Sequence, residues 1–165
     1  MSMLTRHHES SAFVPAPVEK VFGYVDDHRR LSSHMSKSSW MTGGGRMEIG
    51  LDDSRGQSVG ARLRLSGRAF GVPLSLEEIV TEREPPRRKV WETTGAPKLL
   101  VIGAYRMGFE LTPQGNGSVL RVYIDYALPE QAPQRWLGSL FAKSYARWCT
   151  GQMVRDAVEH FALAG

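Results

Sequence analysis

The chain has a single cysteine, Cys149, among its 165 residues. One cysteine cannot form a disulfide within the chain, and the N-terminal stretch MSMLTRHHESS lacks the apolar core of a secretory signal. We therefore expect a cytoplasmic protein. The sequence also has no apolar run near the roughly 18 to 20 residues that a membrane-spanning helix needs, so we expect at most peripheral contact with a membrane.

Motifs for metals and nucleotides are absent as well. The histidines at positions 7, 8, 28, 34 and 160 form no HExxH motif and no cluster with the cysteine. Three glycines in the stretch Thr42 to Met47 do not match a phosphate-binding loop, and they are typical of a loop at the mouth of a cavity. We expect no metal and no cofactor.

The charged residues are dispersed along the sequence and form no dense block. Lysine and arginine number 21 against 17 acidic residues, a net charge of +4, and no block of five or six like charges occurs. This dispersion indicates a solvated basic surface and no nucleic-acid partner. A basic patch for anionic lipid headgroups, made by Arg62, Arg64 and Arg68 with residues 87–89, is the less favoured alternative to an ordinary wet sheet face.

The N-terminal part predicts a strand followed by short helices. Thr5 to Val14 reads as a strand that Pro15 ends, because proline cannot donate a backbone hydrogen bond. From Pro17, apolar residues recur at helical spacing as far as about Asp26. A second short helix is predicted from His28 to Met35.

The middle of the chain alternates apolar and polar residues, which is the pattern of strands with one buried face. Residues 105–112 and 119–128 form the clearest pair, and the glycine-rich PQGNGS between them predicts a hairpin turn. In residues 74–84 the alternation is less regular, and the adjacent Glu77 and Glu78 predict a shift of register or a bulge. Nowhere does the alternation clearly turn an Asp, Glu or His side chain inward.

The C-terminal part, Pro133 to Ala164, returns to helical spacing and predicts one long amphipathic helix. Arg135, Ala146 and Met153 are expected on its outer side. The predicted inner face carries the large apolar side chains Trp136, Leu137, Leu140, Phe141, Trp148, Val154, Val158 and Phe161. The whole order indicates one α+β domain over residues 1–165, in which a curved antiparallel sheet of about six to seven strands wraps around the long helix.

Three stretches carry a family resemblance. The sequence VPAPVEKVFGYVDDHRRLSSHM, followed by IVTEREPPRRKVWE and the C-terminal WCTGQMVRDAVEHF, resembles the helix-grip proteins of the SRPBCC superfamily. That superfamily includes START lipid-transfer domains, birch-pollen-allergen-like proteins and coenzyme Q-binding proteins, and the polyketide cyclase/dehydrase and lipid-transport group looks nearest. The resemblance implies a cavity between the sheet and the long helix.

We expect this cavity to bind, sequester or transport a small hydrophobic molecule such as a lipid, a polyketide or a quinone, in a monomer or a homodimer. The polar groups of Tyr105, Tyr126 or Arg147 would orient one end of it, although the Arg147 side chain is alternatively expected to extend to the edge of the helix. The full set of predicted ligand contacts is Leu63, Leu65, Trp91, Tyr105, Met107, Phe109, Val122, Ile124, Tyr126, Arg147 and Trp148.

Two other functions remain open at this point. The first is a cyclase or dehydratase that acts on a polyketide-like substrate in the same cavity, for which an acid or base must face inward. The second is a non-catalytic interaction module with a filled core. A buried ionisable residue with a shifted pKa would favour catalysis.

Overall fold

The computed structural model describes residues 3–31 and 47–164, which form one antiparallel sheet with three helices packed on it. The strands are β1 (Arg6–Val14), β2 (Met47–Leu51), β3 (Arg62–Ala69), β4 (Val72–Glu84), β5 (Arg88–Lys98), β6 (Tyr105–Gln114) and β7 (Gly117–Tyr126). The helices are α1 (Val18–Val25), α2 (His28–Leu31) and α4 (Gln134–Leu163). This is the predicted helix-grip fold.

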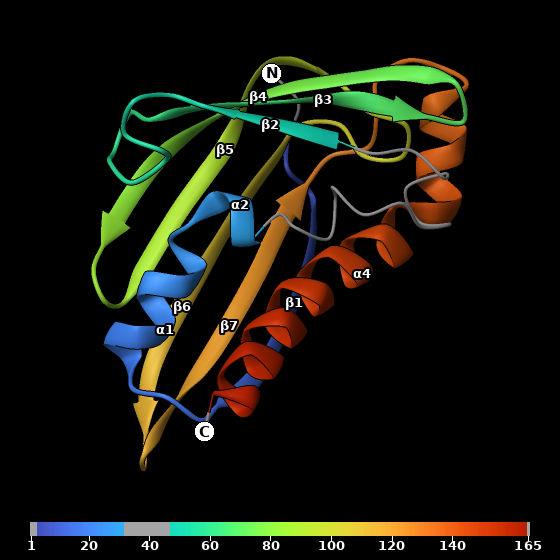
Figure 1. Cartoon of the computed structure of the whole chain (residues 1–165). Coiled ribbons are helices and arrows are strands. Elements are labelled where there is room, and N and C mark those ends of the chain that lie inside the picture. The colour runs from blue at the N-terminus through green and yellow to red at the C-terminus, as the bar shows by residue number, and fades with distance from the viewer. Residues whose placement is uncertain (1–2, 32–46, 165) are drawn as a thin grey trace.

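The seven strands pair in the order β1-β7-β6-β5-β4-β3-β2. The long helix α4 lies against β1 and β7, while β2, β3 and β4 curl over the other end of the sheet (Figure 1). The short helices α1 and α2 follow β1, as predicted. The predicted second helix is seen as far as Leu31; its remaining residues, and all but the last of the glycine-containing stretch Thr42 to Met47, lie outside the described residues.

The sheet register breaks where the sequence predicted irregularity. Ser75 pairs with Lys98 and Glu77 with Thr94, so three residues of β5 (95–97) lie opposite the single Leu76 of β4. Gly95 has a φ of +66°, a conformation that glycine adopts without steric cost. The predicted hairpin between β6 and β7 is also confirmed, with Gly115 at a φ of +57° in its turn.

In the N-terminal half of α4 the buried face is not the one that the sequence predicted, whereas further along Val154 is buried and Val158 and Phe161 pack against the core as predicted. Trp136, Leu140 and Phe141 are 64%, 55% and 52% exposed, whereas Ala146 and Met153 are buried. The buried residues of α4 are Gly138, Ala142, Ala146, Cys149, Thr150, Met153, Val154 and Ala157. The prediction was wrong because hydropathy marks large apolar side chains, while close approach of a helix to a sheet selects small ones.

Two contacts show how closely α4 approaches its neighbours. A Cβ atom added at Gly138 would lie 2.7 Å from the carbonyl oxygen of Val101, so only glycine fits there. The hydroxyl oxygens of Ser10 on β1 and Thr150 on α4 are 2.9 Å apart. None of the described helices combines the length and the apolar composition that crossing a bilayer requires.

Candidate functional site

Most of the predicted contact residues lie together on the inner face of the sheet, each with 6% or less of its surface exposed. They come from four of the strands, β3, β5, β6 and β7, and they belong to one continuous apolar core. These residues are Leu63, Leu65, Trp91, Tyr105, Met107, Phe109, Val122, Ile124 and Tyr126. The alternating pattern therefore placed the strand residues on the correct face.

The two predicted contacts from α4 differ from this set. Trp148 is half-buried and Arg147 is exposed. The exposure of Arg147 agrees with the alternative in which its long side chain extends to the edge of the helix. Arg147 therefore does not belong to the buried inner-face group.

The inner face also holds a carboxyl group that the sequence analysis missed. Glu78 of β4 is 4% exposed, and its Oε1 accepts a short hydrogen bond from the hydroxyl of Tyr105 on β6. Burial raises the pKa of Glu78 from 4.5 to about 7, against the opposing effects of the Tyr105 hydrogen bond and of Lys89. Glu78 is thus close to half-protonated at neutral pH, and it can donate or accept a hydrogen bond.

A signal for Glu78 was present in the sequence. Leu76, Glu78 and Val80 are spaced two apart, and all three are buried. The neighbouring Glu77 points outward, where its Oε1 lies 3.0 Å from Nε of Arg64. Two adjacent glutamates in a strand must face opposite sides, so one of them had to face the core.

Side chains of α4 extend the polar group around Glu78. Burial raises the pKa of Tyr105 well above 10, so its hydroxyl remains a donor, and Tyr145 and Cys149 contribute to this rise. Burial raises the pKa of Tyr145 similarly and that of Cys149 to about 12, which leaves an inert thiol. Cys149 is therefore a buried structural thiol.

A second group of buried charges lies where α1 and α2 meet β4 and β5. Asp26 is 3% exposed, and its carboxylate accepts hydrogen bonds from Arg83 (3.1 and 2.8 Å) and from Nζ of Lys89 (2.9 Å). Burial acts to raise the pKa of Asp26, but these two cations outweigh it and hold the pKa below 3.8. Asp26 is therefore an ionised, fully paired group that ties the helical segment to the sheet.

His28 belongs to the same group but has one nitrogen without a partner. Nζ of Lys89 lies 3.1 Å from Nδ1 of His28, and because an ammonium group only donates, Nδ1 accepts and the proton of the neutral ring sits on Nε2. Burial and the charge of Lys89 lower the pKa of His28 to about 3. Its Nε2 has no hydrogen-bond partner among the described residues.

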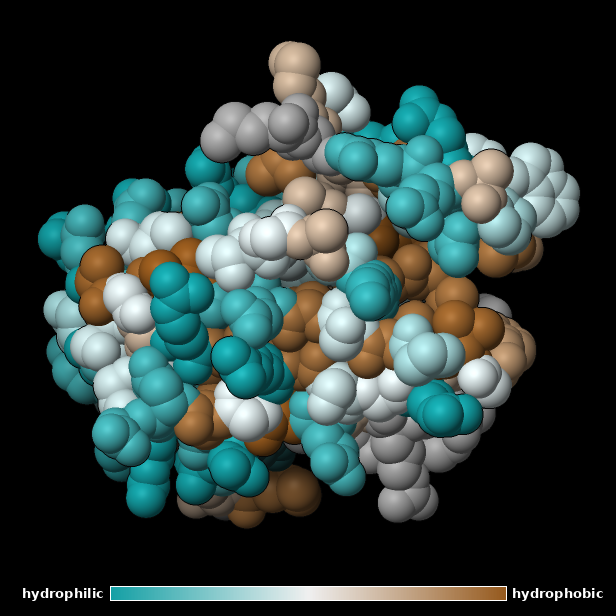
Figure 2. Space-filling model, turned by 90° about the horizontal axis from the view of Figure 1, so that it is seen from above, coloured by the Kyte–Doolittle hydropathy of each residue, from teal (hydrophilic) through white to brown (hydrophobic). Residues whose placement is uncertain are grey.

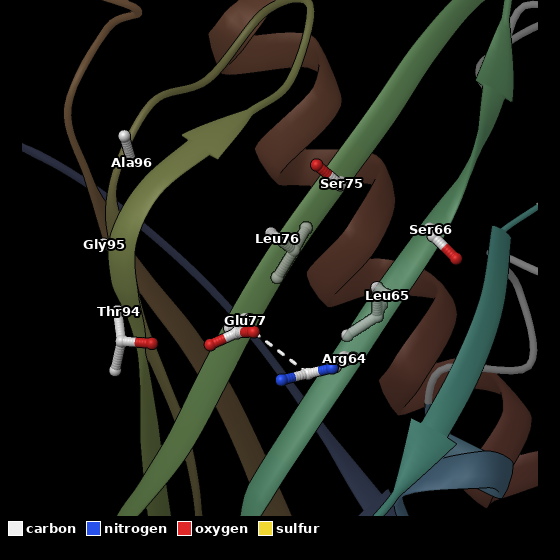
Figure 3. Close-up of a pocket in the computed structure, with 9 residues that line it drawn as sticks. All are labelled: Arg64, Leu65, Ser66, Ser75, Leu76, Glu77, Thr94, Gly95 and Ala96. Carbon is white, nitrogen blue, oxygen red and sulfur yellow. Dashed lines mark ion pairs between the residues drawn. The ribbon is translucent and has the colours of Figure 1, made fainter.

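A hollow of about 320 Å³ opens at the break in register between β4 and β5 (Figure 3). Its lining is mixed and partly exposed, and the ion pair of Arg64 and Glu77 crosses it. The residues around it are Arg64, Leu65, Ser66, Ser75, Leu76, Glu77, Thr94, Gly95 and Ala96. Glu78 and Tyr105 are not among them, so this hollow is distinct from the buried pair.

Comparison with known proteins identifies the family and the fold. Residues 5–162 match the family model described as polyketide cyclase/dehydrase and lipid transport. Zhui aromatase/cyclase from Streptomyces sp. R1128 has a TM-score of 0.70 at 11% identity, with 95% of this chain and 93% of that chain covered.

Protein TTHA0849 from Thermus thermophilus has a TM-score of 0.69 at 14% identity, over 97% and 99% of the two chains. The di-domain ARO/CYC BexL of the BE-7585A biosynthetic pathway has a TM-score of 0.65 at 16% identity, with 96% of this chain and 50% of that chain covered. At these identities the structural likeness establishes the helix-grip fold. No curated protein is detectably similar in sequence.

Proposed function

The chain belongs to the polyketide cyclase/dehydrase and lipid-transport family, and we propose that it binds a small, mostly apolar molecule against the inner face of its sheet. The Glu78–Tyr105 pair hydrogen bonds a hydroxyl or carbonyl oxygen of that molecule, and the surrounding apolar and aromatic residues supply most of the affinity. The single observation that supports this is a buried carboxyl group that pairs with a hydroxyl group rather than with a cation.

Such a carboxyl group is costly for a protein that only needs a filled core. Burying an ionisable group without a cationic partner is unfavourable, and a leucine or methionine of similar volume would pack there at no such cost. The raised pKa of Glu78 measures this cost. Binding of a ligand would explain why the carboxyl group is there, because a polar atom of the ligand forms a strong hydrogen bond with it in an apolar environment.

Ligand binding can be tested on the purified protein with conservative variants. Native mass spectrometry identifies any co-purified molecule, and a panel of lipids, quinones and aromatic polyketides is screened for an increase in Tm. We expect Tyr105→Phe and Glu78→Gln to weaken binding of any hit by up to about tenfold, the upper range for one hydrogen bond. Tyr126→Phe, at the register partner of Tyr105 on β7, is the matched control.

The result that would overturn the proposal is equally clear. If no member of the panel raises the Tm and no molecule co-purifies, the inner face is a filled core and the protein is an interaction module. If ligands bind but Glu78→Gln and Tyr105→Phe behave like Tyr126→Phe, the polar group of the ligand lies elsewhere.

A second candidate is acid–base catalysis at the same pair, and the pKa of about 7 at Glu78 favours it. In this mechanism the ionised Glu78 removes a proton from the carbon beside a substrate carbonyl, and the hydroxyl of Tyr105 donates a hydrogen bond to the resulting enolate oxygen. In a dehydration, protonated Glu78 then returns the proton to a hydroxyl group that leaves as water. Cyclisation would use the same enolate as the nucleophile on a second carbonyl carbon.

Turnover distinguishes this candidate from binding alone. Incubation with β-hydroxy ketone and linear poly-β-ketone substrates should release water or a cyclised product, with a pH–rate limb near 7 that Glu78→Gln abolishes. Glu78→Gln should then lose activity by at least about a hundredfold, the usual contribution of a general acid or base, while substrate binding falls much less. Bound substrate that is never converted would leave binding as the function.

A further inference from the structure

The first half of α4 carries an exposed apolar row that the core does not use. At helical spacing, Trp136, Leu140, Lys143 and Arg147 follow one another at intervals of four, three and four residues, so they lie in one row along the helix. Phe141, about 100° further around the helix than Leu140, is also exposed. In Figure 1 α4 begins at the right-hand side, and the same side of the molecule shows brown hydrophobic side chains beside teal hydrophilic ones in Figure 2.

The charged side chains of α4 itself are all basic as far as position 155. Residues 131–155 contain no aspartate or glutamate, although an even distribution of the 17 acidic residues would place about two or three there. The same stretch contains Arg135, Lys143, Arg147 and Arg155. Burial first, and then the charges of Arg147, His7 and Lys143, lower the pKa of His8 on the adjacent strand β1 against the opposing effect of Glu9, so Arg147 and Lys143 lie close enough to β1 to act on it.

We propose that this outer row of α4, Trp136, Leu140, Lys143 and Arg147, together with the exposed Phe141, docks the protein on a membrane surface that contains anionic lipids. Tryptophan, leucine and phenylalanine enter the boundary between headgroups and acyl chains, while lysine and arginine reach the phosphate groups. Each cation that reaches the surface adds to binding that the apolar side chains alone would leave weak.

A second copy of the chain fits this face less well. A symmetric pairing of the row with itself would bring Lys143 and Arg147 of both copies into one interface, with no acidic residue in the stretch to neutralise them. An anionic membrane removes this repulsion and replaces it with attraction. The proposal concerns the outside of α4 and holds whether or not the inner face binds a ligand.

Co-sedimentation with vesicles tests the docking surface on the full chain. Vesicles of phosphatidylcholine alone are compared with vesicles of phosphatidylcholine and phosphatidylglycerol, at low and at physiological salt. We expect binding to the phosphatidylglycerol vesicles and a loss of at least tenfold in partition for Trp136→Ser combined with Phe141→Ser. Both side chains are exposed, so these variants should keep the Tm of the parent protein.

The charge contribution has its own matched pair of variants. One double variant, on α4, combines Lys143→Glu with Arg147→Glu. The other, on the outer face of β3, combines Arg64→Glu with Arg68→Glu, and it changes the net charge by the same amount. We expect only the α4 pair to abolish binding to phosphatidylglycerol vesicles. Equal loss in both pairs would show a general charge effect and overturn the proposal.

Two further results would also overturn it. One is no binding of the parent protein to phosphatidylglycerol vesicles at low salt. The other is a dimer, measured by light scattering, that Trp136→Ser with Phe141→Ser converts to a monomer, because the row would then be a contact between copies.

Discussion

Two buried carboxyl groups of this protein, Asp26 and Glu78, have opposite electrostatic environments. Asp26 lies between Arg83 and Lys89, and these cations keep its pKa below the usual value. Glu78 has a tyrosine hydroxyl as its hydrogen-bond partner, and burial raises its pKa to about 7. The first group holds the fold together, whereas the second keeps the capacity to exchange a proton or a hydrogen bond with a ligand.

The comparison predicts that loss of Asp26 has the largest effect on stability. In Asp26→Asn the amide leaves the buried ammonium of Lys89 without its counter-ion, and breaking a buried ion pair in this way costs about 3–5 kcal/mol. Urea unfolding at pH 7 measures the change. The control Asp27→Asn, at the adjacent and more exposed carboxylate, should cost less than about 1 kcal/mol. Near-equal effects of the two variants would mean that Lys89 is not charged in the folded protein.

We expect Glu78 to make the free energy of unfolding depend on pH between 4.5 and 7, a range in which Asp26 has no such effect. Because the folded pKa of about 7 exceeds the unfolded value near 4.5, the folded state holds the proton more tightly, and its stability falls as the pH rises from 4.5 to 7. At about 1.4 kcal/mol per pH unit the total is about 3 kcal/mol. His28 works in the opposite direction, since its folded pKa of about 3 lies below 6.5 and its contribution is lost as the pH falls through 6.5.

The contribution of Glu78 to the pH dependence is obtained by subtracting the free energy of unfolding of Glu78→Gln from that of the parent protein. The free energy of unfolding is measured for the parent and for Glu78→Gln at intervals from pH 4.5 to 8, and the contribution of His28 cancels in the subtraction. We expect the parent to lose about 3 kcal/mol relative to Glu78→Gln across this range. A flat difference would show that Glu78 titrates normally, and would remove the basis for a functional carboxyl group at this position.

We expect substitution of Tyr105 to have a smaller effect on the same pH dependence of stability. Its hydrogen bond stabilises the ionised form of Glu78 and lowers that pKa, so in Tyr105→Phe the pKa of Glu78 should rise and the fall in stability should continue to a pH above 7. The variant should also lose about 1–2 kcal/mol, because a buried carboxyl group is left without its partner. Tyr126→Phe controls for loss of a buried hydroxyl. If the fall in stability ends at the same raised pH in both variants, the pairing of Tyr105 with Glu78 is contradicted.

The sequence predicted the strands of the sheet and their buried faces well because alternation in a strand follows directly from geometry. Leu63 and Ile124 are buried as their spacing required, and the long helix has the predicted length within a residue or two at each end. The same reasoning missed Glu78 and His28, because a polar residue at an inward position is read as a break in the pattern. Their burial depends on partners distant in the chain, such as Tyr105 and Lys89.

The helix α4 shows a second limit of sequence patterns. In its C-terminal half the apolar row is covered, since Tyr24 of α1 stacks on His160 at 4.3 Å and meets Phe161 edge-on at 5.7 Å. In its N-terminal half the continuation of that row, with Trp136 and Leu140, is exposed. The same apolar pattern is therefore buried in one half of the helix and exposed in the other. Only the tertiary structure shows which half α1 covers.

The smallest expected effect belongs to the residue beside Glu78. Glu77→Gln removes a charge from an exposed side chain paired with Arg64 at 3.0 Å, and exposed ion pairs contribute little, so unfolding should change by less than about 0.5 kcal/mol. Urea unfolding is measured for Glu77→Gln and for Glu78→Gln under the same conditions. The two substitutions differ by one position in the chain and lie on opposite faces of the sheet. A pH-dependent loss at Glu77 as large as the one at Glu78 would mean that burial is not what distinguishes the two glutamates.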